Sequence, residues 1–347
     1  MRILLSLMKW LAGAALLVFL ALMIWQRELI IYGLGQLRGQ LHVIFQARPV
    51  AEVLNDPLFP DSLKVKLRMT QRIRRYAIDR LGMNDSGTYT EIYDQQGKPV
   101  LWVITACPPF TMEEHLWKFP ILGYMPYKGY FDHARGLAEA DRLRDQGLDV
   151  SYSPVAGWST LGWFEEPLLS NMLRRSEGEL AELLIHELMH ATAFHRGHTD
   201  YNENLATFVG ERGAEDYLMT SYGSASPQLR TYRELLEDEM TFGTHMLEAC
   251  HRLEVLYTGF SPDLTDSIKH QLKDSLIRVI LEETGALPLH RPERFTYNLQ
   301  GKGLPGNTYF LGYKRYRKDQ QILTKKLERM NGDLREFIRR EATDSAG

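Results

Sequence analysis

The sequence predicts a mainly helical α+β protein, because helical periodicity covers most of the chain and strand-like runs are few and short. Apolar residues recur at helical spacing in eight stretches: 62–82, 133–147, 168–175, 177–195, 203–221, 227–257, 262–284 and 316–341. Strand-like runs occupy 88–94, 99–105 and 149–155. The first two are joined by the polar segment 94–98, which predicts a β-hairpin. We therefore expect a small sheet beside a helical body.

Composition bounds the class of protein. The chain has 347 residues and a net charge of −3, with 41 Lys and Arg against 44 Asp and Glu, and gives no case for a nucleic-acid partner. Residues 27–347 are enough for one large domain or two intimately packed ones. Cys107 and Cys250 allow at most one intramolecular disulfide, and two unpaired buried thiols are equally compatible with the sequence.

The first 26 residues predict a membrane anchor. Residues 3–25 are apolar except for Lys9, and about 23 helical residues span roughly 35 Å. Arg2 and Lys9 precede the long apolar part, which favours a cytoplasmic N-terminus and an exported body, although Arg27 weakens this bias. A cleavable signal peptide is the alternative, but no small-x-small site lies just beyond the apolar run.

Residues 186–190 read His-Glu-Leu-Met-His and carry the clearest chemical signal. Two histidines four residues apart on a helix lie about one turn apart, so both imidazoles can bind one metal ion. Glu187 between them is placed to take a proton from a metal-activated water. A random chain of this composition would contain such a motif about 0.04 times. The segment therefore predicts the core of a zinc hydrolase.

The flanking residues favour a helix at this motif. Ser176 and Glu179 fit a capping box that begins a helix just before Glu177, and the following leucines make the helix strongly apolar. Burying two histidines in such a helix would be costly unless a partner satisfied them, and a metal ion does so.

A catalytic zinc ion normally takes a third protein ligand, and Glu203 is the preferred candidate. It belongs to a second apolar-periodic helix whose first turn could pack beside the histidine pair. Asp200 is the alternative ligand, and Asn202 could cap the second helix or support the site. The pattern HExxHxxGxxH is excluded, because Ala193 and Arg196 stand where it needs Gly and His.

The motif HELMH, followed by Asn-Glu-Asn-Leu-Ala at 202–206, resembles the gluzincin arrangement of zinc peptidases. More closely, the chain resembles a bacterial family of zinc-dependent aminopeptidases with an HELAH-like motif and a nearby NExxAT segment. The resemblance covers most of the chain after the N-terminal segment, including 39–41, 48–50, 127–132 and 158–164. It implies a zincin-like metallopeptidase domain over 27–347, one zinc ion on His186, His190 and Glu203, and Glu187 as general base. In a bacterium the anchor would be a single pass through the inner membrane, with the catalytic domain in the periplasm.

The peptide end that such a site would cut is open. Well-studied gluzincin aminopeptidases hold the substrate's free amine with a GxMEN segment, which this chain lacks. The acidic candidates for that contact are Asp132, Glu165, Glu166 and Glu211, although each also fits a surface or helix-face role. An endopeptidase with the same site is one alternative function. A non-catalytic, membrane-anchored peptide-binding or scaffold protein is another.

The segment before the zinc helix is the expected substrate wall. The strand-like run 149–155 could pair with an extended peptide or protein substrate, and Trp158, Trp163 and Phe164 could line subsites or pack in the core. A phenol or imidazole should also stabilise the oxyanion, and Tyr130 is the catalytic candidate, with Tyr127 as its alternative.

Overall fold

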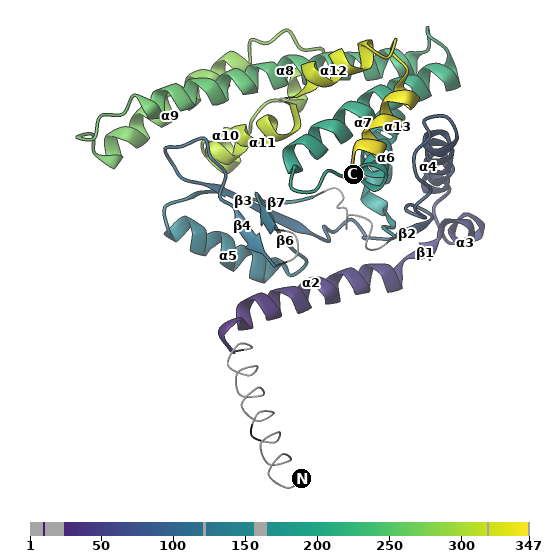
Figure 1. The fold of residues 1–347 in the computed structure, drawn as a ribbon, viewed down its shortest axis with the longest axis horizontal. Coiled ribbons are helices and arrows are strands. Elements are labelled where there is room, and N and C mark those ends of the chain that lie inside the picture. The colour runs from purple at the N-terminus through teal and green to yellow at the C-terminus, as the bar shows by residue number, and fades with distance from the viewer. Residues whose placement is uncertain (1–9, 11–23, 121–122, 156–164, 318, 346–347) are drawn as a thin grey trace.

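A computed structural model describes the chain except for residues 1–9, 11–23, 121–122, 156–164, 318 and 346–347. Helices dominate it, and short strands form small sheets beside them, which confirms the expected mainly helical α+β class (Figure 1). The principal helices are α2 (Arg27–Gln46), α4 (Asp61–Asp79), α5 (His133–Asp145), α6 (Glu177–Thr192), α7 (Thr199–Tyr222), α8 (Pro227–Thr258) and α9 (Asp266–Thr284). Shorter helical segments are α3 (Val50–Asn55), η1 (Ser170–Arg174), η2 (Pro292–Arg294) and α10 (Leu299–Lys302).

Among the described residues, three small sheets accompany these helices. One has the order β1 (Arg48–Pro49), β2 (Glu91–Tyr93), β8 (Leu168–Leu169); the second is β6 (Lys128–Tyr130), β3 (Trp102–Cys107), β7 (Asp149–Pro154); the third pairs β4 (Trp117–Phe119) with β5 (Gly123–Met125). In the second sheet β3 pairs antiparallel with both neighbours, with Ile104 opposite Lys128 and Tyr152. This leaves β7 as an edge strand.

The predicted hairpin between 88–94 and 99–105 is wrong. The two runs form β2 and β3, which belong to different sheets. β2 pairs antiparallel with β1 and parallel with β8, whose residues are distant in the sequence. The turn at Gly97 is present, with φ of 75°, but it separates the two sheets instead of joining two paired strands. The predicted helix at 168–175 is likewise replaced by β8 and the short 3₁₀ segment η1.

The helix pair α6 and α7 forms the centre of the largest core. Ser176 begins α6 as predicted: its hydroxyl accepts from the Glu179 backbone N–H, and the Glu179 carboxylate accepts from the Ser176 N–H at 3.1 Å. Leu184 and Leu188 of α6 and Leu205 and Val209 of α7 are fully buried in this core. Helix α4 packs against α6, and α8 packs against α7, so the motif-bearing helix is enclosed on several sides.

The remaining elements lie on two sides of this centre. Figure 1 shows α5 below the strands β3, β6 and β7, with α2 beneath that layer, while α8 and α9 run along the opposite side of the molecule. A separate core joins α8, α9 and the segment after α10, and it contains Phe242 and Phe310. Cys107 and Cys250 are both buried in it as free thiols, and burial raises the pKa of each to about 12.

The predicted C-terminal helix at 316–341 is divided. The chain instead forms α11 (Asn307–Arg317), α12 (Gln320–Glu328) and α13 (Leu334–Ser345). Asn331 and Gly332 take positive φ values of 54° and 75°, a left-handed turn that ends helical propagation between α12 and α13. Phe337 and Ile338 of α13 are then folded back into the core around α7.

Within the part of the chain that the structure describes, no helix has both the length and the hydropathy needed to cross a membrane. The predicted span at 3–25 falls almost entirely on residues 1–9 and 11–23, which lie outside the described residues. The membrane anchor therefore stays a prediction.

The capping box of α6 should make stability depend on pH. Burial would raise the pKa of Glu179, but hydrogen bonds from Ser176 and Arg294 outweigh this and lower it from 4.5 to about 2. A carboxyl whose pKa is lower in the folded state stabilises the fold above its unfolded pKa. This contribution should be lost as pH falls from 4.5 towards 2. Urea unfolding should show that the free energy of unfolding of the wild type exceeds that of Glu179→Gln, and that this difference shrinks over this pH range. A constant difference would contradict this account.

Candidate metal centre

The two histidines of the motif meet on one face of α6. The Nε2 atoms of His186 and His190 are 3.2 Å apart, and the ring centroids are separated by 4.9 Å with the planes at 81°. His190 is buried and His186 is partly buried. The spacing of four residues on a helix therefore brings two imidazole nitrogens to one point, as the sequence predicts.

Glu203 brings a carboxylate to the same point from α7. Its Oε2 lies 3.6 Å from the Nε2 of His186 and 3.7 Å from the Nε2 of His190. Ligand atoms about 2.0–2.1 Å from a tetrahedral zinc ion are separated by about 3.3 Å, so this set is close to the size that zinc requires. Glu203 lies in the second turn of α7, because that helix begins four residues earlier than Glu203, at Thr199.

The alternative ligand Asp200 is not part of this cluster. Among the described residues, the ligand atoms that lie within 4.8 Å of one another at the motif belong to His186, His190 and Glu203. Asp200 lies in the first turn of α7, and its backbone carbonyl accepts from the side chain of Asn204 at 2.9 Å.

Asn202 holds the loop that joins the two helices. Its Oδ1 accepts from the backbone N–H of His195 at 2.9 Å, and its Nδ2 donates to the His195 carbonyl at 2.8 Å. This buried side chain thus bonds both the N–H and the carbonyl of one backbone residue, and so fixes α7 relative to the end of α6. Asn202 therefore supports the site, one of the two roles that the sequence suggests.

A close helix crossing also positions Glu203. A Cβ added at Gly210 would lie 2.9 Å from the carbonyl oxygen of Glu182 and 3.3 Å from the Cβ of His186. Glycine at this point lets α7 approach α6 closely beside His186, about two turns after Glu203.

Gly210→Val should therefore separate the ligands. The added side chain must push α7 away from α6, which should destabilise the protein by about 1–3 kcal/mol and weaken metal binding. Thermal unfolding and metal content of the purified variant would measure both effects. Gly33→Ala on α2 is the control, because its added Cβ meets nothing within 4 Å. Undiminished metal content in Gly210→Val would contradict the assigned role of the crossing.

The charges around the histidines are strongly coupled. Burial would raise the pKa of Glu203, but the imidazoles of His186 and His190 outweigh this and lower it. Burial would lower the pKa of His190, but the Glu203 carboxylate outweighs it in turn and raises that pKa. Without a metal ion the Glu203 carboxylate therefore stabilises a proton on His190, and a bound metal ion would have to displace that proton.

Glu187 lies beside this cluster in an enclosed environment. Burial raises the pKa of its carboxyl, and the nearby acidic groups of Glu203 and Glu166 raise it further, against the opposing effect of the imidazoles. Tyr89 is close enough for the Glu187 charge to raise its pKa, although burial is the larger cause. Tyr89 is also held at a φ of 67°, an uncommon conformation for a tyrosine, and its backbone N–H donates to the Glu166 carbonyl. No motif or periodicity in the sequence points to Tyr89.

A pocket of about 570 Å³ adjoins the metal centre. It is lined by residues of α6, α7, α8, α11 and β7, among them Ser151, Glu182, His186, Thr207 and Glu239. Ser151 is a residue of β7, so this strand reaches the pocket, and its role as a substrate wall stays a prediction. The aromatic lining comes from Phe242, Phe295, Tyr309 and Tyr313, whose positions in the sequence carry no recognisable motif.

Three carboxylates from three helices gather beside this pocket, and two of them, Glu182 and Glu239, line it. Glu182 of α6, Glu211 of α7 and Glu239 of α8 place carboxylate oxygens within 4.8 Å of one another. Glu182 also accepts a hydrogen bond from the hydroxyl of Tyr232 at 2.8 Å. Among the four acidic residues considered from the sequence as contacts for a free amine, Glu211 is the one in this cluster.

Several other predicted residues lie elsewhere. Tyr130 packs in a core cluster with Ile104, Ala140 and Leu143, and its ring contacts Tyr32 of α2 at 5.4 Å. The structure thus places Tyr130 against α5 and α2 and not in the lining of the pocket at His186.

Asp132 caps α5 by accepting from the Arg135 N–H at 3.2 Å, and Glu165 is exposed beside Gly87. Tyr127 lies between β5 and β6. Trp158, Trp163 and Phe164 fall outside the described residues.

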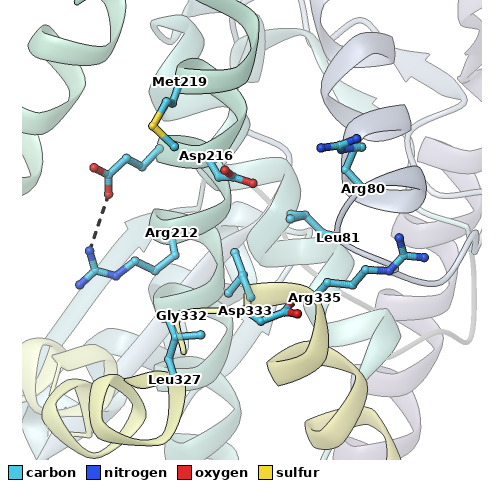
Figure 2. Close-up of a pocket in the computed structure, with 11 residues that line it drawn as sticks. Arg80, Leu81, Arg212, Asp216, Met219, Leu327, Gly332, Asp333 and Arg335 are labelled. Carbon is cyan, nitrogen blue, oxygen red and sulfur yellow. Dashed lines mark ion pairs between the residues drawn. The ribbon is translucent and has the colours of Figure 1, made fainter. Parts of the chain in front are cut away.

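A second pocket of about 480 Å³ lies between the end of α4, α7 and the segment joining α12 to α13 (Figure 2). It shares no lining residue with the pocket at His186. Its walls carry charges of both signs, some of them paired: Arg212 lies 3.7 Å from Glu215, and Asp216 accepts from the hydroxyl of Tyr76 at 2.5 Å. This balance favours no particular class of ligand.

Comparison with known families gives a match over most of the chain. Residues 32–344 match the profile of a family described as "Putative aminopeptidase". The chain belongs to this family. No curated protein and no solved structure matches the chain. Membership in an aminopeptidase family indicates a peptide hydrolase, which agrees with the class of enzyme expected from the sequence.

Proposed function

We propose that the protein is a zinc-dependent aminopeptidase. The observation that carries this proposal is the convergence of His186, His190 and Glu203, whose ligand atoms lie within 4.8 Å of one another beside Glu187. Two imidazoles and one carboxylate form a ligand set that is used by catalytic zinc in peptidases. Membership in an aminopeptidase family supports the same reaction class.

The residues divide the work of hydrolysis between them. When bound, zinc polarises a carbonyl and lowers the pKa of water. His186, His190 and Glu203 would hold the ion, and Glu187 would accept the proton of the attacking water and deliver it to the leaving amine. Asn202 and Gly210 keep α7 at the separation from α6 that this arrangement needs.

The surroundings suit an extended peptide. Among the described strands β7 lies at the edge of its sheet with Ser151 at the pocket, so a peptide could add to the sheet there and direct its carbonyl to the metal centre. Membership in an aminopeptidase family favours an aminopeptidase over an endopeptidase with the same metal centre.

A cleavage assay with matched peptides tests the proposal. Peptides with a free amino terminus should lose their first residue, and the same peptides with an acetylated terminus should be cleaved far more slowly. Removal of metal with a chelator should abolish turnover, and added Zn²⁺ should restore it. The metal content of protein purified without chelators should approach one zinc ion per chain.

Two outcomes would favour the alternatives. Equal cleavage of acetylated and free peptides at internal bonds would indicate an endopeptidase. Folded protein that contains no metal and cleaves no member of a peptide library would indicate a non-catalytic peptide-binding or scaffold protein.

We also propose that residues 3–25 anchor the protein in the bacterial inner membrane with the catalytic domain in the periplasm. The support is the apolar composition of these residues and the placement of Arg2 and Lys9 before the long apolar part. Protease protection of the catalytic domain in intact cells, and its loss when the outer membrane is permeabilised, would be the expected result.

A further inference from the structure

Helix α2 has one face packed against the body of the protein. The hydroxyl of Tyr32 and the amide of Gln36 both donate to the backbone carbonyl of Gly129, at 3.0 and 2.8 Å. A Cβ added at Gly39 would lie 2.2 Å from the ring of Phe131, so the helix backbone approaches this ring closely. Val43 is fully buried. These contacts fix the rotation of α2 about its axis and therefore determine which residues face outward.

The outward face of α2 is apolar and basic. Positions 27, 31, 34, 38, 41 and 45 are spaced by four and three residues in turn, so they lie along one face of the helix. They read Arg, Ile, Leu, Arg, Leu and Phe. The exposed fractions are 49% for Ile31, 60% for Leu34 and 79% for Phe45, and Arg27 and Arg38 are exposed as well. Such large apolar side chains in a row on one surface helix indicate an interaction surface.

The charge of this region points to an anionic partner. Residues 1–50 contain five basic residues, Arg2, Lys9, Arg27, Arg38 and Arg48, and a single acidic residue, Glu28. The whole chain has slightly more acidic than basic residues, so the basic excess is local. An apolar face with arginines among its aromatic and aliphatic side chains is the pattern of a helix that lies in the plane of a membrane interface. Arginines near an anionic lipid surface stabilise such binding, whereas they would repel the same face of a second copy.

We propose that the outward face of α2 lies in the headgroup region of an anionic lipid bilayer, with the helix axis along the membrane surface. The apolar residues 3–25 directly precede the helix, and the exposed Ile24 and Trp25 join the two segments. α2 lies on the opposite side of the strands β3, β6 and β7 from α8 and α11, which line the pocket at His186 (Figure 1). Contact through α2 therefore fixes the orientation of the catalytic domain and directs the metal centre away from the lipid.

The test is to measure the depth of a fluorescent label on α2 in the full-length protein. Leu34→Cys would carry an environment-sensitive label in a background in which Cys107 and Cys250 are replaced by alanine. Met240→Cys on α8, where the native side chain is 64% exposed, is the matched control. The protein would be reconstituted in phosphatidylcholine vesicles with and without phosphatidylglycerol, and quenched either by spin-labelled lipid or by aqueous iodide.

The expected result is a blue-shifted emission from the Leu34 label that loses most of its intensity to the lipid quencher and little to iodide. The Met240 label should respond only to iodide. In phosphatidylglycerol vesicles Arg38→Glu should reduce lipid quenching of the Leu34 label, and in phosphatidylcholine alone it should have little effect. Quenching of the Leu34 label by iodide and not by lipid would overturn the proposal. Shielding from both quenchers would also overturn it, since it would indicate that protein, such as a second copy, covers α2.

Discussion

Glu187→Gln should retain bound zinc and lose nearly all peptidase activity. The side chain adjoins the ligands but is not one of the three that gather at the metal centre, so the ligand set remains intact. Glutamine has nearly the same volume and can still form hydrogen bonds, but it cannot accept a proton from water. General acid–base catalysis contributes about 10²- to 10⁴-fold to a rate, and we expect kcat to fall by an amount of this order. KM should change little, because Glu187 acts on the reacting water and not on the bound peptide.

The measurement is steady-state hydrolysis of a peptide with a free amino terminus, with zinc content determined on the same sample. Glu215→Gln is the matched control: this partly buried carboxylate lies on α7 and pairs with Arg233 at 2.7 Å, away from the metal ligands. The control should retain wild-type activity. Wild-type turnover by Glu187→Gln would rule out the proposed general base. Loss of zinc from that variant would instead show that Glu187 is needed to bind the metal.

The convergence of the three candidate metal ligands could be predicted from the sequence because their geometry is local. His186 and His190 need only a helix, and the capping box at Ser176 and Glu179 indicates where that helix begins. Glu203 needs one further assumption, that two apolar helices joined by a short loop pack against each other. The structure brings all three residues together, with Asn202 bridging the loop. Local periodicity thus contains most of the information for this part of the molecule.

The rest of the pocket depends on contacts between distant segments. Glu182, Glu211 and Glu239 lie on three successive helices, and helical periodicity does not specify which faces of α6, α7 and α8 meet. The same limit explains the incorrect hairpin: β2 and β3 have strand-like sequences, but β2 pairs with β8, whose residues lie more than 70 positions later. Residue type alone makes Tyr130 a candidate, whereas the packing of β6 against α5 and α2 determines where its ring lies.

One signal in the sequence could have identified the break in the C-terminal helix. Asn331-Gly332 is a dipeptide that readily adopts a left-handed turn, and the structure has both residues at positive φ. The periodicity of the flanking apolar residues continues across it, which conceals the break. The preference of these two residues for left-handed backbone therefore decides the local structure, because this conformation prevents α12 from continuing into α13.

Glu203→Gln should lose zinc, whereas Asp200→Asn should retain it. Substitutions of residues that only support a metal ligand lower affinity by about 10- to 100-fold, so loss of a carboxylate ligand should lower zinc affinity by more than about 100-fold. The two substitutions remove one negative charge each from the same helix, three residues apart. They therefore separate a ligand at the metal centre from a general effect of charge on α7.

Zinc-dependent stabilisation gives a readout that does not require activity. A ligand that binds only the folded protein stabilises it by about 2.7 kcal/mol at a free concentration of 100 times its Kd. Added Zn²⁺ should accordingly raise the Tm of metal-free wild type and of Asp200→Asn, and should have little effect on Glu203→Gln. The melting curve of Glu203→Gln without metal would establish that the variant is folded. The reverse pattern, with zinc retained by Glu203→Gln and lost from Asp200→Asn, would make Asp200 the third ligand. That result would also require α7 to begin differently, because in the present structure Glu203, and not Asp200, gathers with His186 and His190.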